Sequence, residues 1–199
     1  MKKRIDLIVP TTLFDIPLKH YQEFIKTFQG QDEKNYTNEY AACKMLEIFC
    51  GLKKAETLNI KITDLNKIVG KLNKALSEKP SLITRFKLGD TEFGFVPKLD
   101  ELTFGEFVDL ESYINDWSTM HKAMAILYRP VVRSLGSKYE IEEYKGDIWD
   151  DIMLDMPSAV AVSSLVFFYR LESDLLRVTL NSSEVVQEGM IETLRQAET

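Results

Sequence analysis

The amino-acid sequence predicts an α+β protein, dominated by helices, with two short β-hairpins packed on amphipathic helices. Three observations support this fold class. Apolar residues recur every three to four positions over much of the chain, as on the buried face of a helix. Polar and apolar residues alternate on either side of two glycine turns, Gly89-Asp90 and Leu135-Gly136. Hydrophobic residues make up 45% and charged residues 28% of the 199 residues, which is an ordinary globular composition and excludes a disordered chain.

The first 80 residues predict an edge strand followed by helices. The alternating segment 4–9 is expected to be the strand, because Pro10 ends it. A first helix is expected from Pro17, a residue favoured in the first turn, to Phe28. A second is expected from Thr37 or Asn38 to Phe49. A third is expected after an N-cap at Thr63, with an apolar stripe formed by Leu65, Ile68, Val69, Leu72 and Leu76.

A change of pattern follows Pro80. Residues 82–88 and 91–96 predict a β-hairpin around Gly89-Asp90. Thr103 and Glu106 have the spacing of a capping box, which predicts a helix through Asn115. A further helix is expected over residues 118–128 and should stop at Arg129-Pro130, because a residue before proline disfavours the α region.

The last third predicts a second hairpin and more helices. Strands are expected at 131–133 and 138–144, and a short helix at 147–155. A long apolar helix should run from Ser158 to about Leu176 and form the spine of the core, with Phe168 among its buried residues. A final helix is expected over 183–195. The chain is expected to form either two domains, 1–80 and 81–199, or a single domain over 1–199.

Charge is distributed unevenly. Residues 53–89 carry nine Lys or Arg against three acidic residues, whereas residues 90–116 carry eight acidic residues against one lysine. These segments either face each other inside one fold or form a bipolar surface that meets a neighbouring copy or partner. The net charge of −6 argues against nucleic-acid contact. Candidate interface residues are those on the two oppositely charged segments: Lys67, Lys71, Lys74, Glu101, Glu106 and Asp109.

No catalytic constellation emerges from the sequence. His20 and His121, the two histidines, stand outside any metal-binding spacing, and the chain contains no GxSxG or glycine-rich phosphate loop. Asp147, Asp151 and Asp155 would share one helix stripe, but no second acidic cluster faces them in the sequence. We therefore expect no enzyme, no metal and no cofactor.

The cysteines and the most apolar segments indicate the cellular compartment of the protein. Cys43 and Cys50 lie two helical turns apart, too far for a disulfide, and are expected to be buried free thiols. The apolar run after the first residues is too short and too polar for a signal peptide, and the stretch 157–169 is too short to cross a bilayer. We expect synthesis in a reducing cytoplasm and no membrane contact.

Several segments of the sequence nevertheless resemble segments of a known protein family. They are FGFVPKLD at 93–100, TFGEFVD at 103–109, WSTMHKAMAILYRP at 117–130, YKG at 144–146 and Met156-Pro157. Together, over about residues 82–176, they resemble small proteins encoded in the structural or tail modules of tailed bacteriophages, crAss-like phages among them. The first 80 residues add little to this resemblance.

The resemblance implies a non-enzymatic virion protein, a ring or connector subunit of the neck or tail that acts by oligomeric docking. Its partners would be copies of itself and other tail or neck proteins, and it would reside in the virion after synthesis in the host cytoplasm. A tail-assembly chaperone that stays in the cytoplasm is the alternative, and an unrecognised enzyme is a more distant one. The six candidate interface residues would then mediate head-to-tail contact between subunits.

Overall fold

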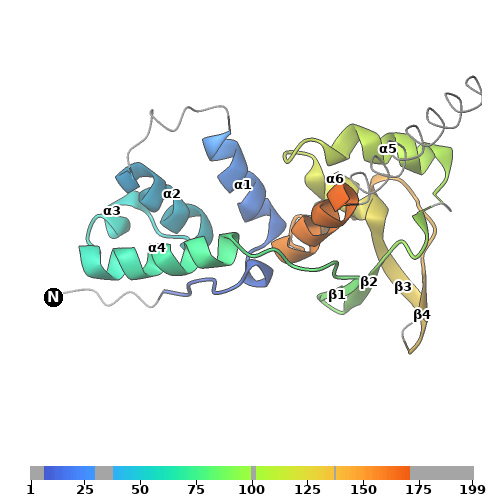
Figure 1. The fold of residues 1–199 in the computed structure, drawn as a ribbon, viewed down its shortest axis with the longest axis horizontal. Helices are drawn as coiled ribbons and strands as arrows, with labels where there is room; N and C mark the ends of the chain where they lie inside the picture. The colour runs from blue at the N-terminus through green and yellow to red at the C-terminus, as the bar shows by residue number, and fades with distance from the viewer. Residues whose placement is uncertain (1–6, 30–37, 100–101, 137, 171–199) are drawn as a thin grey trace, which may run out of the picture.

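A computed structural model describes residues 7–29, 38–99, 102–136 and 138–170. It confirms a helix-dominated α+β fold with a four-stranded antiparallel sheet. The N-terminal helices α1–α4 gather toward one end of the long axis, and the sheet lies toward the other end together with α5 and α6, as Figure 1 shows. The predicted helix over 183–195 lies outside the described residues. Within the described residues no helix combines the length and the apolar character needed to cross a bilayer.

The N-terminal end consists of helices. They are η1 (Leu13–Asp15), α1 (Leu18–Phe28), α2 (Asn38–Cys50), α3 (Lys54–Thr57) and α4 (Ile62–Leu76). The three helices predicted in this region are confirmed within a few residues. The N-cap of α4 is Lys61 rather than Thr63, so the threonine lies in the first turn. The η1 turn is held by Asp15, whose Oδ2 accepts hydrogen bonds of 2.9–3.0 Å from the N–H and hydroxyl groups of Thr11 and Thr12.

The predicted edge strand over 4–9 is wrong for the part that the structure describes. Residues 7–9 are irregular, and residues 4–6 lie outside the described chain. The alternation reflects packing against helices instead. Leu7 and Val9 pack on the N-terminal helical core, whereas Ile8 between them is 90% exposed.

The two predicted hairpins form one continuous sheet. Its strands are β1 (Arg85–Leu88), β2 (Thr91–Phe95), β3 (Tyr128–Leu135) and β4 (Lys138–Ile141), in that order. The join is the antiparallel pairing of β2 with β3, in which Phe93 lies opposite Pro130 and Phe95 opposite Tyr128. The turns fall at Gly89 and Gly136, both with positive φ, as the sequence predicts.

The helix predicted over 118–128 is confirmed as α6 (Met120–Leu127), which ends before Arg129-Pro130. The strand after it begins earlier than predicted, because Tyr128 starts β3 directly and the proline lies within the strand. Proline's fixed φ suits an extended strand as well as a helix stop, and its carbonyl still accepts a hydrogen bond from the Glu142 N–H at 2.8 Å. The strand predicted at 138–144 correspondingly ends at Ile141.

Two hydrophobic clusters form the core. One lies between the inner face of the sheet and α6, and includes Phe93, Phe95 and Tyr128. The other lies among the N-terminal helices and includes Leu46 and Leu72. The helix over 158–170 serves both clusters: Val160 belongs to the first and Ala159 to the second. It runs between the two ends of the molecule in Figure 1, coloured orange.

Contacts through this helix tie distant segments together. The Tyr128 hydroxyl donates to the Ile83 carbonyl at 2.7 Å and lies 2.8 Å from the Ser164 hydroxyl. At the start of the helix, the Ser158 N–H donates to the Ile16 carbonyl at 2.8 Å. Phe168, predicted to be buried, is only partly so, because the helix approaches the edge of the core at that point.

The helix predicted at 147–155 is shorter and irregular. It divides into a 3-10 turn, η4 (Asp147–Trp149), and a single α-helical turn, α7 (Asp150–Met153). The stripe of Asp147, Asp151 and Asp155 therefore does not form on one regular helix. Asp155 instead pairs with Lys19 of α1, with 2.6 Å between Nζ and Oδ1.

Candidate functional site

The lysines predicted at an interface lie on the outer face of α4. Leu72 and Ala75 mark its buried side, and Lys67, Lys71 and Lys74 lie on the opposite side and are exposed. Lys67 Nζ is 3.8 Å from Asp64 on the same helix, a long and exposed contact that stabilises little. This set of lysines, hereafter the α4 lysine face, is accessible to another molecule.

Helix α5 (Phe104–Ile114) lies at the other end of the molecule and is anchored to the sheet at its first turn. The predicted capping box is confirmed: the Glu106 N–H donates to Thr103 Oγ1 at 3.3 Å, and the Thr103 N–H donates to Glu106 Oε2 at 2.6 Å. The second oxygen of Glu106 accepts from Arg129 Nη1 of β3 at 2.9 Å. The ion pair is buried, since Glu106 is 5% and Arg129 8% exposed.

A second anchor holds the middle of α5. The Tyr144 hydroxyl donates to Asp109 Oδ2 at 3.0 Å. Burial, and then the hydrogen bond to this carboxylate, raise the pKa of the Tyr144 hydroxyl far above its ordinary value. Tyr144 therefore remains a neutral donor, and Asp109 is half-buried beneath it.

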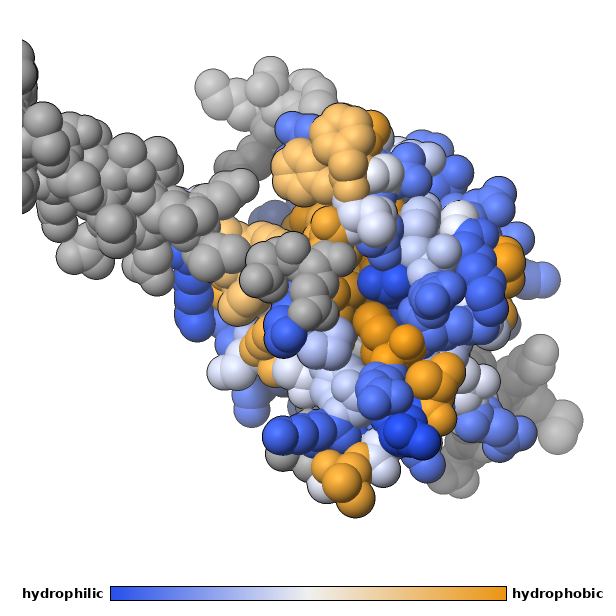
Figure 2. Space-filling model, turned by 90° about the vertical axis from the view of Figure 1, so that its right-hand side faces the viewer, coloured by the Kyte–Doolittle hydropathy of each residue, from blue (hydrophilic) through white to orange (hydrophobic). Residues whose placement is uncertain are grey.

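The outer side of α5 carries large apolar side chains that are exposed to solvent. Phe104 is 82% exposed, and Phe107 and Val108 are exposed on the same face, three and four residues further along. Glu111 follows as an exposed acid. Figure 2, which views the molecule from this end, shows orange hydrophobic patches among blue hydrophilic residues. These four residues are called the α5 face below.

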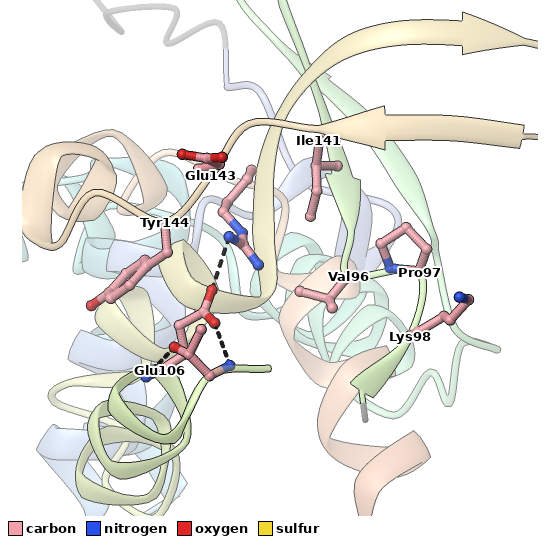
Figure 3. Close-up of a pocket in the computed structure, with 9 residues that line it drawn as sticks. Val96, Pro97, Lys98, Glu106, Ile141, Glu143 and Tyr144 are labelled. Carbon is pink, nitrogen blue, oxygen red and sulfur yellow. Dashed lines mark hydrogen bonds and ion pairs between the residues drawn. The ribbon is translucent and has the colours of Figure 1, made fainter. Parts of the chain in front are cut away.

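A cavity of about 420 Å³ opens between the start of α5 and the sheet. Its walls come from the segment after β2, the start of α5, β3, the end of β4 and the segment that follows β4. In Figure 3, Val96, Pro97 and Lys98 lie on one side, and Glu106 and Tyr144 on the other. The remaining lining residues are Thr103, Arg129, Ile141 and Glu143.

Arg129 is the residue of this cavity whose hydrogen bonds are incomplete. Its Nη1 engages Glu106, but its Nε is buried and has no hydrogen-bond partner. A buried guanidinium N–H without an acceptor costs free energy, so the side chain is held in a state that an added acceptor would stabilise. Glu143 also lines the cavity; it is exposed, and no contact of its carboxylate is found among the described residues.

The structure separates the residues predicted at the interface. Glu106 is buried and bound to Arg129, so its inclusion in an accessible surface is corrected. Asp109 is half-buried under Tyr144, and Glu101 lies outside the described residues. In the part of the chain that the structure describes, no ion pair joins the α4 lysine face to α5, which lies at the opposite end of Figure 1. The two charged segments do meet in the β1–β2 hairpin, where Arg85 Nη1 is 3.9 Å from Glu92.

The side chains considered for catalysis are dispersed. His121 Nδ1 lies 3.1 Å from the Gln22 side-chain amide, and burial lowers the pKa of His121. Burial also lowers the pKa of His20, on α1. Burial raises the pKa of the Cys50 thiol to about 11, which makes it a poor nucleophile. Among the described residues no cluster of His, Cys, Asp or Glu has the arrangement of a metal site.

Sequence reasoning missed Arg129, Tyr144 and the α5 aromatics as features of one region. The dipeptide Arg129-Pro130 indicates a helix stop and gives no sign that the arginine lies on a strand. A local signal existed for the α5 face: Phe104, Phe107 and Val108 are apolar residues at helical spacing.

Comparison with known proteins adds no assignment. No protein-family model, no curated protein and no solved structure matches the chain.

Proposed function

We propose that the protein is a non-enzymatic structural subunit of a tailed-phage particle, a ring or connector component of the neck or tail that acts by docking. The observation that carries the proposal is the placement of two different exposed faces at opposite ends of one subunit. The α4 lysine face is cationic, and the α5 face is aromatic and acidic. The sequence resemblance to phage structural-module proteins supports the same function.

The chemistry of the two faces is complementary. Lysine ammonium groups are attracted to aromatic ring faces, and the aliphatic stems of lysine can cover apolar surface. Glu111 adds an opposite charge beside Phe107 and Val108. A contact between the α4 lysine face of one subunit and the α5 face of the next would be head-to-tail, and head-to-tail contacts that close form rings.

Charge reversal tests the contact. The triple variant Lys67→Glu, Lys71→Glu, Lys74→Glu should lose self-association in sedimentation velocity, with an unchanged melting temperature because the three side chains are exposed. A matched control reverses three exposed lysines elsewhere, Lys79, Lys87 and Lys138, with the same change in net charge. Added salt should weaken association of the parent protein, since exposed charges are screened beyond about 8 Å at physiological ionic strength.

Equal loss in the test and control triples would refute a specific contact through α4. If the parent protein is monomeric, the test and control triple variants are compared instead for binding to the phage's other tail and neck proteins.

Mass spectrometry of purified phage particles tests whether the protein is a component of the particle. A stoichiometric multiple of copies in the particle is the expected result. A cytoplasmic tail-assembly chaperone is the second candidate, favoured by the exposed α5 aromatics, which could hold an apolar client segment. Absence from particles combined with presence in infected cells would refute the virion subunit and favour the chaperone.

A further inference from the structure

We propose that the cavity between α5 and the sheet is a binding site for a carboxylate group, with Arg129 as the residue that holds it. This inference concerns the cavity alone and does not depend on the proposed docking function. Its starting point is the buried arginine with an unpaired Nε–H described above.

The geometry of the guanidinium indicates a carboxylate. Arginine presents its N–H groups in a fixed planar fork, and two parallel N–H groups on one edge match the two oxygens of a carboxylate. Glu106 occupies Nη1. The edge formed by Nε and Nη2 is therefore the one left to a ligand, and Nε on that edge lacks an acceptor.

Glu106 cannot turn to satisfy this edge without losing another bond. Its Oε2 accepts from the Thr103 N–H at 2.6 Å, which closes the capping box of α5. The carboxylate of Glu106 is thus fixed between the helix start and Nη1, and a second acceptor must come from elsewhere.

The charge in the cavity favours a ligand with one negative charge. Arg129 and Lys98 contribute positive charge, and Glu106 and Glu143 contribute negative charge. A phosphate with nearly two negative charges would be repelled by the two glutamates more strongly than a monoanionic carboxylate. The volume of about 420 Å³ is in the range of small-ligand pockets and also admits an acidic side chain of a peptide.

Glu143 is the competing group at the opening. It is the exposed acid of the cavity lining, and its negative charge opposes the approach of a carboxylate to Arg129. A ligand carboxylate therefore binds against the repulsion of the Glu143 charge. Removal of the Glu143 charge should consequently strengthen binding, an effect that a purely structural role of Arg129 would not produce.

The direct measurement is a titration followed on the arginine Nε–H signals in ¹⁵N NMR spectra of the full chain. Two probes supply the carboxylate: N-acetylglycine, a free acid, and a blocked tripeptide with a central glutamate. Their controls are N-acetylglycinamide and the same tripeptide with central glutamine. Inorganic phosphate is the third anion.

A saturable shift of the Arg129 Nε–H signal with a carboxylate probe and not with its amide is the expected result. A response to the tripeptide alone identifies an acidic peptide as the source, and a response to N-acetylglycine identifies a free acid. No saturable shift with either acid overturns the proposal. Equal shifts with the amide controls, or tighter binding of phosphate, also overturn it.

Variants sharpen the test. Arg129→Lys should weaken binding by roughly tenfold or more, because the paired N–H edge is lost. Arg133→Lys, the matched change at an exposed position of the same strand, should leave binding unchanged. Glu143→Gln should strengthen binding about two- to fivefold. If Arg129→Lys does not fold, the test rests on the comparison of each acid probe with its amide control and on the Glu143→Gln variant. Unchanged or weaker carboxylate binding by Glu143→Gln contradicts the proposal.

Discussion

Gly94, in the middle of β2, is the position where a single methyl group should disturb the sheet. It pairs with Arg85 on one side and Arg129 on the other. A Cβ at this position would lie 2.5 Å and 2.8 Å from two ring carbons of Tyr139 and 3.0 Å from Val131 Cγ2. Ordinary carbon contacts are about 3.5–4.0 Å, so Gly94→Ala forces the tyrosine ring to move by roughly 1 Å.

The Tyr139 ring is not free to move. Its hydroxyl donates to the Phe95 carbonyl at 2.7 Å, a bond with a net contribution of about 0.5–1.5 kcal/mol. Arg85 lies over the ring, 5.5 Å from its centroid, which adds about 0.5–1 kcal/mol. Alanine lowers the conformational entropy of the unfolded chain relative to glycine, which offsets roughly 0.4–1 kcal/mol of this loss of stability. We expect Gly94→Ala to lower the free energy of unfolding by about 1–2 kcal/mol, within the usual cost of overpacking.

Urea unfolding followed by tryptophan fluorescence measures this change. Trp117 and Trp149 both pack on the cluster beside the sheet and report its loss. In a Tyr139→Ala background the cost of Gly94→Ala should fall, because the two closest contacts are gone and the contact with Val131 Cγ2 remains. Gly105→Ala is the matched control: nothing lies within 4 Å of its added Cβ, and we expect a gain of roughly 0.5 kcal/mol. The reasoning is refuted if Gly94→Ala costs the same with and without the Tyr139 ring.

Two further predictions concern buried polar contacts and acid. Tyr128→Phe should cost about 1–2 kcal/mol in urea unfolding, because it removes the hydroxyl between the Ile83 carbonyl and Ser164; a loss near zero would mean that those groups find other partners. Hydrogen bonds from two upstream threonines lower the pKa of Asp15, so its stabilising contribution is complete above its unfolded pKa of about 3.9 and is lost as pH falls through the lower folded value. Asp15→Asn should therefore lower the melting temperature at neutral pH and bring the two proteins closer together at strongly acidic pH, whereas a constant difference would contradict this.

Local signals account for the parts of the fold that the sequence predicted well. Thr103 and Glu106 fix the start of α5 through bonds three residues apart, and Gly89 sets a turn by its own backbone conformation. The β2–β3 pairing joins Phe95 to Tyr128 across two intervening helices, and no pattern within either segment specifies it. The same limit explains the single sheet that was predicted as two hairpins.

The candidate site shows the same division between local and distant information. Glu106 was recognised both as a cap and as an interface acid, and only its distant partner Arg129 decides between these roles. The exposure of Lys67, Lys71 and Lys74 followed from helical spacing, because the apolar stripe of α4 defines the opposite side. The cavity depends on side chains from residues 96 to 144 and could not be read from any one of them.

The helix over 158–170 has a consequence for the order in which the chain folds during synthesis. Both hydrophobic clusters include residues of this helix: Val160 belongs to one and Ala159 to the other. The Ile16 carbonyl also accepts its hydrogen bond from the Ser158 N–H at the start of the helix. A nascent chain that has emerged only as far as residue 157 therefore exposes apolar surface from both halves, although most of their residues are already present. At synthesis rates of about 5–20 residues per second, this exposure lasts for seconds. Completion of both cores then coincides with the emergence of one late segment, and a ribosome stalled before it should hold a chain that proteases cut in either half.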